Sequence, residues 1–281
     1  MEEKIEILND QNIVIKSYYR NNSSETLVIY FHGFAGWYDK CAKTIANMCD
    51  ENNFSFLVPL TQGAGIINTM KCYNGVEYTS LTRGGCYEKL EDYKADYKSV
   101  IKFAKEQNYK KIILIGHSLA CNKIVDYLSE NTVNNLVSII LLAPQDLTDI
   151  TTQNPNLLKQ TTTLLGQNKE EEILSGKFLG FCDISARTFL SFQNDCFLHN
   201  LQYKNPNFKF DKFSKLNLPI AVFIGDKDEG LNNIYDAEIC MQRLKNYNKN
   251  VNITILENCN HTFKNSEEKL SILIKEYLKT L

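Results

Sequence analysis

The strongest constraint on the fold of this chain comes from residues 111–120, which read KIILIGHSLA. The apolar residues before Gly116 predict a buried strand, and a helical pattern follows Ser118. A serine held on a sharp turn between a strand and a helix is a nucleophile elbow, whose crowded backbone needs small residues two positions before and after the serine. Gly116 meets this need, and Ala120 stands where the usual pattern has glycine.

Apolar, β-branched runs alternate with longer helical patterns along most of the chain, which is typical of an α/β fold. An early strand at residues 13–19 is expected to be antiparallel. Further strands are expected at residues 26–31, 54–60, 111–115, 136–142, 218–224 and 251–256. Helices are expected at residues 38–52, 88–107 and 119–129, and from residue 265 onward.

The alternation stops between residues 145 and 216, a stretch that is too long for an ordinary loop. It is polar, with a helical pattern at residues 170–179, and it carries several phenylalanines. We therefore expect a core formed by residues 1–145 and 217–281, with residues 146–216 inserted as a helical cap over the sheet. The phenylalanines expected to line a substrate pocket are Phe178, Phe181, Phe189, Phe192 and Phe197.

The composition excludes several classes of protein. The 31 basic and 33 acidic residues give a net charge of −2, which argues against a nucleic-acid surface. The longest apolar runs are far shorter than the ~20 residues of a membrane-spanning helix, so no membrane insertion is expected. The first residues lack a signal-peptide pattern, and the cytoplasm is the expected location. None of the nine cysteines forms a C-x-x-C pair, so reduced, mostly buried thiols are expected.

A serine nucleophile needs a base, and that base needs an orienting carboxylate. Along a chain of this kind the expected order is serine, acid, histidine. Ser118, Asp228 and His261 follow this order, and each lies just past the carboxyl end of an expected strand. Because ligands bind at that edge of a parallel sheet, three loops can bring the three side chains together. Asp228 is the preferred acid, and Asp226 is the alternative, or else the residue that holds the loop by accepting backbone N–H bonds.

The base is assigned to His261 because the other three histidines have different explanations. His32 and His117 occupy motif positions where structural roles are expected, and His199 lies in the expected cap. Cys121, three residues after Ser118, could in principle be a nucleophile at the start of a helix. A packed core thiol is the preferred interpretation of Cys121.

Backbone N–H groups are expected to bind the oxyanion of a tetrahedral intermediate. One belongs to Leu119, directly after the nucleophile. The second is expected from Phe34, since Gly33 lets the backbone approach closely. Arg83, in the sequence Arg83-Gly84-Gly85, would bind a substrate carboxylate or phosphate, or else is an exposed arginine on a turn. No spacing of histidines and carboxylates indicates a metal site.

These motifs resemble the α/β-hydrolase superfamily over nearly the whole chain. The residues that carry the resemblance are 31–34 (FHGF), 116–120 (GHSLA), 225–228 (GDKD) and 260–261 (NH). The resemblance implies a doubly wound, mostly parallel eight-stranded sheet, a Ser-Asp-His triad and no cofactor. Residues 83–85 and 142–147 look similar to a bacterial and fungal branch of the superfamily, some of whose members are linked to siderophore metabolism.

The function expected from the sequence is a serine hydrolase that cleaves a small carboxylic ester through an acyl-enzyme on Ser118. A thioesterase and a peptidase are alternatives on the same triad. Because a fold does not fix a function, a non-catalytic ligand-binding protein and a lyase or haloperoxidase on this scaffold also stay open.

Overall fold

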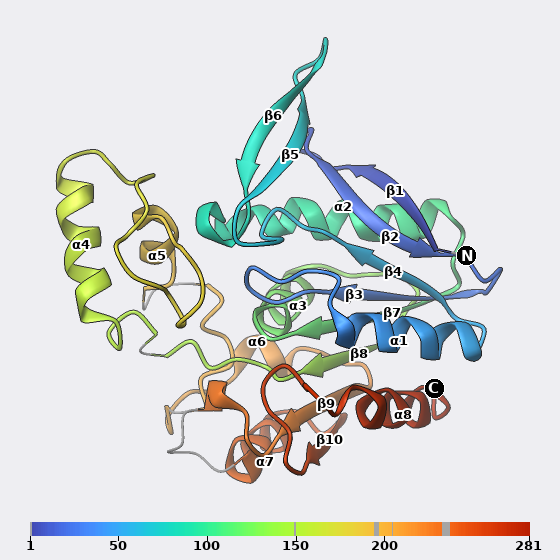
Figure 1. Cartoon of the computed structure of the whole chain (residues 1–281). Coiled ribbons are helices and arrows are strands. Elements are labelled where there is room, and N and C mark those ends of the chain that lie inside the picture. The colour runs from blue at the N-terminus through green and yellow to red at the C-terminus, as the bar shows by residue number, and fades with distance from the viewer. Residues whose placement is uncertain (1, 149, 194–196, 204, 232–236) are drawn as a thin grey trace.

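The computed structural model describes residues 2–148, 150–193, 197–203, 205–231 and 237–281. Its centre is an eight-stranded sheet with the strand order β1-β2-β4-β3-β7-β8-β9-β10, and β5 and β6 form a separate two-stranded sheet (Figure 1). β1 pairs with β2, and β2 with β4, in antiparallel register. All the other neighbours in the large sheet are parallel. This arrangement confirms the α/β class that the sequence predicts.

The strands of the large sheet are short and mostly buried in its centre. They are β1 (Glu2–Leu8), β2 (Val14–Arg20), β3 (Thr26–Phe31), β4 (Ser55–Pro59), β7 (Lys111–His117), β8 (Leu136–Leu142), β9 (Ile220–Gly225) and β10 (Val251–Leu256). Every residue of β4 and β9 is buried. Strands buried on both faces read as continuous apolar runs, which is why the sequence locates them well.

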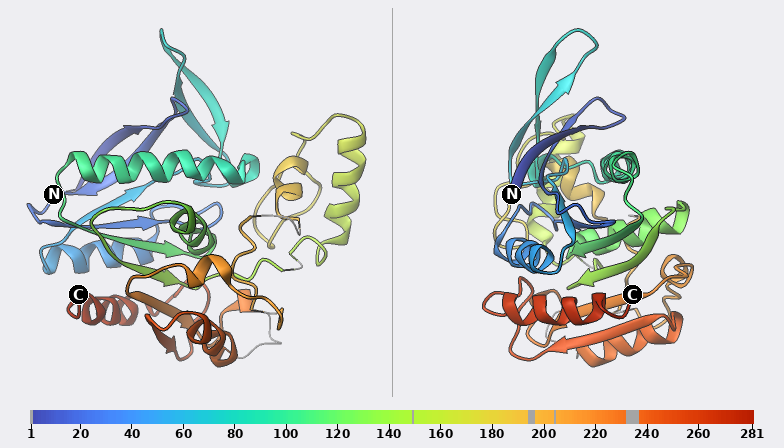
Figure 2. Two further views of the ribbon diagram at one scale, coloured as in Figure 1. Left: turned by 180° about the vertical axis from the view of Figure 1, so that it is seen from behind. Right: turned by 90° about the vertical axis from the view of Figure 1, so that its right-hand side faces the viewer.

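Helices cover both faces of the large sheet (Figures 1 and 2). α1 (Lys40–Glu51) and α8 (Glu267–Leu278) pack on one face, where Ile45 and Ile274 belong to the same apolar cluster. α2 (Tyr93–Glu106) and α3 (Leu119–Glu130) pack on the other face, and α7 (Ala237–Tyr247) contributes Leu244 to that second cluster. The sheet is therefore enclosed between two apolar layers.

The segment between β8 and β9 contains α4 (Pro155–Gly166), α5 (Ala186–Ser191) and α6 (Asp211–Ser214). In Figure 1, α4 and α5 lie beyond the carboxyl ends of the central strands, and the view from behind agrees (Figure 2). The expected helix at residues 170–179 is wrong. Gly176 has a φ of 124°, which a right-handed helix cannot contain, and Ile173 pairs instead with Ser185 in an isolated bridge.

Two elements near the N-terminus are absent from the sequence-based expectations. β1 alternates charged and apolar side chains, and the hairpin of β5 (Asn68–Tyr73) and β6 (Tyr78–Arg83) is largely exposed. The helix expected from residue 88 begins at Tyr93, because the preceding residues form two 3₁₀ turns, Gly85–Tyr87 and Leu90–Asp92. A third 3₁₀ turn, Glu229–Leu231, follows β9.

No helix within the described residues is long and apolar enough to cross a bilayer. The cysteines whose side chains are described are free thiols, and all of them except Cys72 are buried. Cys196 lies outside the described residues. These thiols pack as small apolar side chains, as their scattered positions in the sequence suggest.

Candidate active site

Three of the sequence-predicted residues form one chain of hydrogen bonds at the carboxyl edge of the sheet. Ser118 follows β7, Asp228 follows β9 and His261 follows β10. The Ser118 Oγ lies 2.9 Å from the His261 Nε2. The His261 Nδ1 lies 2.8 Å from the Asp228 Oδ1. The separations suit proton transfer between the hydroxyl and the imidazole.

Ser118 is held on a strained turn between β7 and α3. Its φ of 56° and ψ of −123° lie outside the regions that non-glycine residues ordinarily adopt. The Ser118 N–H donates to the Leu142 carbonyl at 2.8 Å, which ties the turn to the neighbouring strand β8. A Cβ on Gly116 would lie 2.7 Å from the Ile124 Cδ1 and 3.0 Å from the Ala120 carbonyl, so only glycine fits at Gly116.

The two aspartates after β9 have different environments. The Asp228 side chain is fully buried, and its Oδ1 accepts hydrogen bonds from His261 and from the Gly230 N–H. Asp226 is exposed, and its Oδ1 accepts the Cys259 N–H at 3.2 Å. Asp228 therefore meets the histidine, whereas Asp226 holds the loops after β9 and β10 together, which is the alternative role considered for it.

His261 is held by contacts beyond Ser118 and Asp228. Its N–H donates to the Glu229 Oε2 at 3.0 Å, and its carbonyl accepts from the His117 Nε2 at 3.0 Å. The Gln145 amide nitrogen lies 3.4 Å from the His261 Nδ1. Burial, and then the charge of His261, lower the pKa of His117, so His117 stays neutral and donates its proton to the His261 carbonyl.

The loop after β3 brings a second backbone segment to Ser118. A Cβ on Gly33 would lie 2.8 Å from the Ser118 Cβ, so the glycine backbone approaches the serine more closely than any other residue could. The N–H groups of Phe34 and Leu119 donate to no acceptor among the described residues. Two unpaired donors beside one hydroxyl are the arrangement that an oxyanion requires.

His32 holds the loop after β3 in place. Its Nδ1 lies 2.9 Å from the Gly33 carbonyl, and its Nε2 accepts the Thr61 N–H at 3.2 Å, so the proton sits on Nδ1. Burial lowers the pKa of His32 to about 4, which keeps the ring neutral in the folded protein. His32 thus holds the loop in place through these contacts, which is the structural role expected of it.

A cavity of about 580 Å³ opens in front of Ser118. Its charged side chains are Asp39 and Glu229, and no lysine or arginine is among the described residues that line it. The complete lining comprises His32, Gly33, Phe34, Ala35, Gly36, Asp39, His117, Ser118, Gln145, Leu179, Phe181, Glu229, Gly230, Asn260, His261 and Thr262. The volume is in the range of cavities that hold small organic ligands.

Some predicted residues lie elsewhere. Arg83 does not line the cavity, because its Nε donates to the Gln62 Oε1 at 3.0 Å and its Nη2 lies 3.9 Å from Asp92. The substrate-binding role expected for Arg83 is therefore not supported by its position. Cys121 is buried and its Sγ–H donates to the Gly116 carbonyl at 3.1 Å, and burial raises its pKa well above that of a free thiol.

The expected cap contributes fewer phenylalanines to the cavity than the sequence suggests. Phe181, which is half exposed, lines it together with Leu179. Phe178 and Phe192 are buried and contact the Phe34 ring edge-on, at 5.6 and 5.5 Å between ring centroids. The described part of the chain contains no cluster of three histidine, cysteine or carboxylate side chains that could hold a metal ion.

Sequence reasoning missed Asp39, Gln145 and Glu229. Asp39 precedes helix α1 and caps its N-terminus, where its Oδ1 accepts the Ala42 N–H at 2.9 Å. Gln145 follows β8 and Glu229 follows β9, so both lie past the carboxyl ends of parallel strands. The position of Gln145 and Glu229 after parallel strands could have identified them as site residues, because side chains there converge on the edge of the sheet where ligands bind.

A family described as "Protein of unknown function (DUF1749)" matches residues 42–281. The chain belongs to this family. Its matched range contains the elbow, the loop with Asp228 and the loop with His261. No curated protein matches the sequence.

Solved structures similar to this DUF1749 member have the α/β-hydrolase fold. Est1E from Butyrivibrio proteoclasticus, solved with bound ferulic acid, is 18% identical, with a TM-score of 0.68 and 98% of each chain covered. The siderophore hydrolase EstB from Aspergillus fumigatus is 13% identical, with a TM-score of 0.68, and the match covers all of this chain and 98% of that one. The esterase Pf2001 from Pyrococcus furiosus is 17% identical, with a TM-score of 0.65, and the match covers all of this chain and 91% of that one. At these low sequence identities the structural similarity establishes the α/β-hydrolase fold, which the sequence motifs predict.

Proposed function

We propose that this protein is a serine hydrolase that cleaves a carboxylic ester through an acyl-enzyme on Ser118. The observation that carries the proposal is the continuous chain of hydrogen bonds from Ser118 through His261 to the buried Asp228, at the wall of a ligand-sized cavity. The similarity to esterases, a lipase and a siderophore hydrolase is consistent with this chemistry.

The contacts assign a role to each group. The Ser118 Oγ attacks the ester carbonyl while the His261 Nε2 takes its proton. Asp228 accepts a hydrogen bond from the Nδ1–H of His261 and stabilises the imidazolium that forms. His261 then protonates the leaving alcohol, and it activates the water that releases the acid from Ser118.

The N–H groups of Phe34 and Leu119 bind the developing oxyanion. Each such donor is worth roughly 3–4 kcal/mol of transition-state stabilisation, because it is oriented before the charge forms. Gly33 permits the loop with Phe34 to approach Ser118 closely, and the contacts of His32 with Gly33 and Thr61 keep this loop in place.

The negative charge of the active-site cavity bears on the charge of the substrate that it favours. Asp39 and Glu229 have no ion-pair partner among the described residues, and each uses one oxygen to accept a backbone N–H. Like charges repel in a low-dielectric cleft, and a cleft lined with one sign of charge concentrates the opposite sign. The favoured substrate is thus a neutral or cationic ester, with residues 146–216 acting as a cap that places Leu179 and Phe181 against its apolar part.

Hydrolysis of p-nitrophenyl acetate and butyrate by the wild type and by Ser118→Ala tests the proposal. Ser129→Ala is the matched control, since Ser129 lies at the far end of the same helix α3. We expect turnover by the wild type and the control and none above background by Ser118→Ala. Thioester and anilide analogues of the butyrate, assayed in parallel, distinguish an esterase from the thioesterase and peptidase alternatives.

A further inference from the structure

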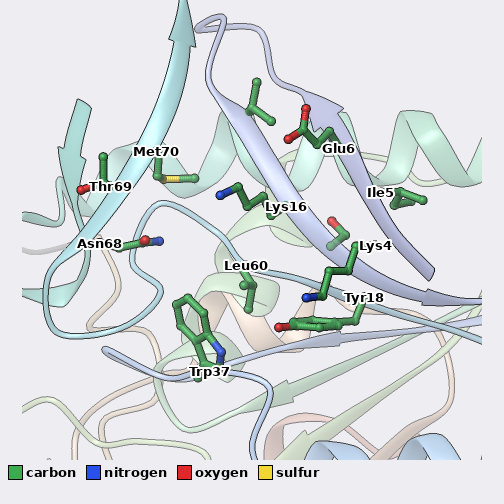
Figure 3. A pocket seen from close by; sticks show the side chains of 12 residues that line it. Lys4, Ile5, Glu6, Lys16, Tyr18, Trp37, Leu60, Asn68, Thr69 and Met70 are labelled. Carbon is green, nitrogen blue, oxygen red and sulfur yellow. The ribbon is translucent and has the colours of Figure 1, made fainter. Parts of the chain in front are cut away.

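A second cavity, of about 480 Å³, shares no lining residue with the candidate active site, although its Trp37 directly follows Gly36 of the active-site cavity. It is formed by β1, β2, the start of β5 and the loop that contains Trp37 (Figure 3). Its lining residues are Lys4, Ile5, Glu6, Val14, Lys16, Ser17, Tyr18, Trp37, Leu60, Asn68, Thr69 and Met70. The volume suits a small organic ligand.

Two aromatic rings border this second cavity. Trp37 is 42% exposed, a large apolar area to leave in contact with water. Its ring packs on Gly65, where a Cβ would lie 3.3 Å from the Trp37 Cζ3, so the indole is held in place. Tyr18 packs against Tyr38, at 4.6 Å between ring centroids. Rigid, partly exposed rings are suited to bind a planar ligand by stacking.

Two ammonium groups accompany the rings. Lys4 lies opposite Tyr18 in the register of β1 and β2, and its Nζ is 5.8 Å from the centroid of the Tyr18 ring. Neither Lys4 nor Lys16 forms an ion pair with any carboxylate of the described residues. Figure 3 shows the side chains of Lys4 and Lys16 extending toward the space bordered by Leu60.

The one carboxylate in the lining does not cancel these charges. Glu6 accepts from the Lys71 Nζ at 3.0 Å, and in Figure 3 its carboxylate is turned away from Trp37. Lys71 thus pairs with Glu6, which also lies opposite Lys16 in the register of β1 and β2, so one carboxylate faces two lysines and Lys4 has no ion-pair partner among the described residues. The Asn68 side chain adds an amide that can donate to an anion (Figure 3).

From this combination we infer that the second cavity binds a small aromatic anion, with the ring against Trp37 and the acidic group near Lys4 and Lys16. An aromatic carboxylate satisfies both parts of the site. The ring gains stacking and apolar contact with Trp37, Tyr18 and Leu60, and the acidic group supplies the charge that the lysines lack. The inference does not depend on the hydrolase chemistry proposed for Ser118.

Trp37 makes this inference directly testable, because it is the only tryptophan of the chain. Under tryptophan-selective excitation, the emission of the full-length protein comes from Trp37, and the effect of variants at Lys4 and Lys16 assigns a quenching ligand to the second cavity. Titration with 4-nitrobenzoate, whose nitroaromatic ring quenches indole, should give saturable quenching that weakens as salt screens the lysines. The uncharged isostere 4-nitrobenzamide should bind roughly tenfold or more weakly if two partly exposed ion pairs contribute.

Lys4→Met and Lys16→Met keep the apolar part of the side chain and remove its charge. Each variant should weaken the Kd of 4-nitrobenzoate by roughly threefold to fivefold. Lys105→Met, on the last turn of α2, is the matched control and should leave the Kd unchanged. Quenching that is linear and unsaturable, equal affinity for the acid and the amide, or no effect of either lysine variant would each overturn the inference.

Discussion

A methyl group added at Gly33 should disable the candidate site while leaving its catalytic side chains intact. In Gly33→Ala the new Cβ would lie 2.8 Å from the Ser118 Cβ and 3.1 Å from the His117 carbonyl. Carbon atoms in favourable contact are about 3.5–4.0 Å apart, so the loop or the serine must move by roughly 1 Å. A misplacement of that size in a catalytic constellation costs on the order of 100-fold in rate, or about 2.7 kcal/mol of activation free energy.

The assay is steady-state hydrolysis of p-nitrophenyl butyrate, with kcat and KM measured separately. We expect the loss in kcat, because the displaced atoms are the nucleophile and the loop with the Phe34 N–H. Overpacking should also lower the free energy of unfolding by about 1–3 kcal/mol, so activity is compared well below the melting temperature. Gly166→Ala is the control, since its Cβ would meet no atom within 4 Å. If Gly33→Ala keeps the wild-type kcat, the loop does not approach the nucleophile as described, and the oxyanion assignment fails.

Three further predictions concern single groups. Asp228→Asn should lower kcat by roughly 10⁴-fold, as loss of the orienting carboxylate does in other triads. Asp226→Asn should change kcat by less than about tenfold. Similar losses for both variants would contradict the assignment of Asp228 as the acid. Asp39→Asn and Glu229→Gln remove a negative charge but keep an oxygen that can accept the backbone N–H. Each variant should raise kcat/KM for a carboxylate-bearing ester and lower kcat/KM for its trimethylammonium isostere. An unchanged ratio of the two kcat/KM values would refute the preference for neutral or cationic esters. Burial lowers the pKa of His32 from 6.5 in the unfolded chain to about 4 in the folded protein. Between pH 6.5 and pH 4 the unfolded chain therefore binds a proton on His32 that the folded protein does not bind. The free energy of unfolding falls as the pH falls through this interval. Chemical denaturation at several pH values should show that the stability advantage of the wild type over His32→Gln shrinks by roughly 3 kcal/mol across that interval, and a constant difference would exclude the linkage.

The sequence locates the candidate site well because the relevant residues follow buried strands. A central parallel strand is a continuous apolar run, so β7 and β9 can be found from composition alone, whereas the edge strand β10 is found from its β-branched residues. The residues just after these three strands share one edge of the sheet. Ser118 and His261 are predicted in this way, and the hydrogen bonds between them and Asp228 have the expected order.

The sequence favours Asp228 over Asp226 but leaves Asp226 open as an alternative, because both lie in one loop after β9. The Cys259 N–H, which lies in the loop after β10 and 33 residues away in the sequence, donates to Asp226 and gives it a different role. Arg83 failed as a predicted ligand group for a related reason, since Gln62 and Asp92 occupy its guanidinium. Side-chain partners distant in the sequence decide such cases, and local patterns do not contain them.

The second cavity had no signal in the sequence. Lys4, Tyr18, Trp37 and Asn68 come from four separate segments, and each is an ordinary residue for its local element. The hairpin β5–β6 that completes the cavity is exposed and polar, so its pattern resembles that of a loop. Only the three-dimensional arrangement brings Lys4 and Lys16 beside the partly exposed rings of Trp37 and Tyr18.

The central claim, that Ser118 is a covalent nucleophile, is tested most directly by trapping the acyl group. The wild type is mixed with p-nitrophenyl butyrate and quenched in acid, and the peptide that contains residues 112–123 is fragmented in a mass spectrometer. The account predicts a butyryl group on Ser118, which is absent from Ser118→Ala and accumulates to a smaller extent in His261→Ala. A butyryl group on Cys121, or turnover by Ser118→Ala equal to that of the wild type, would contradict it.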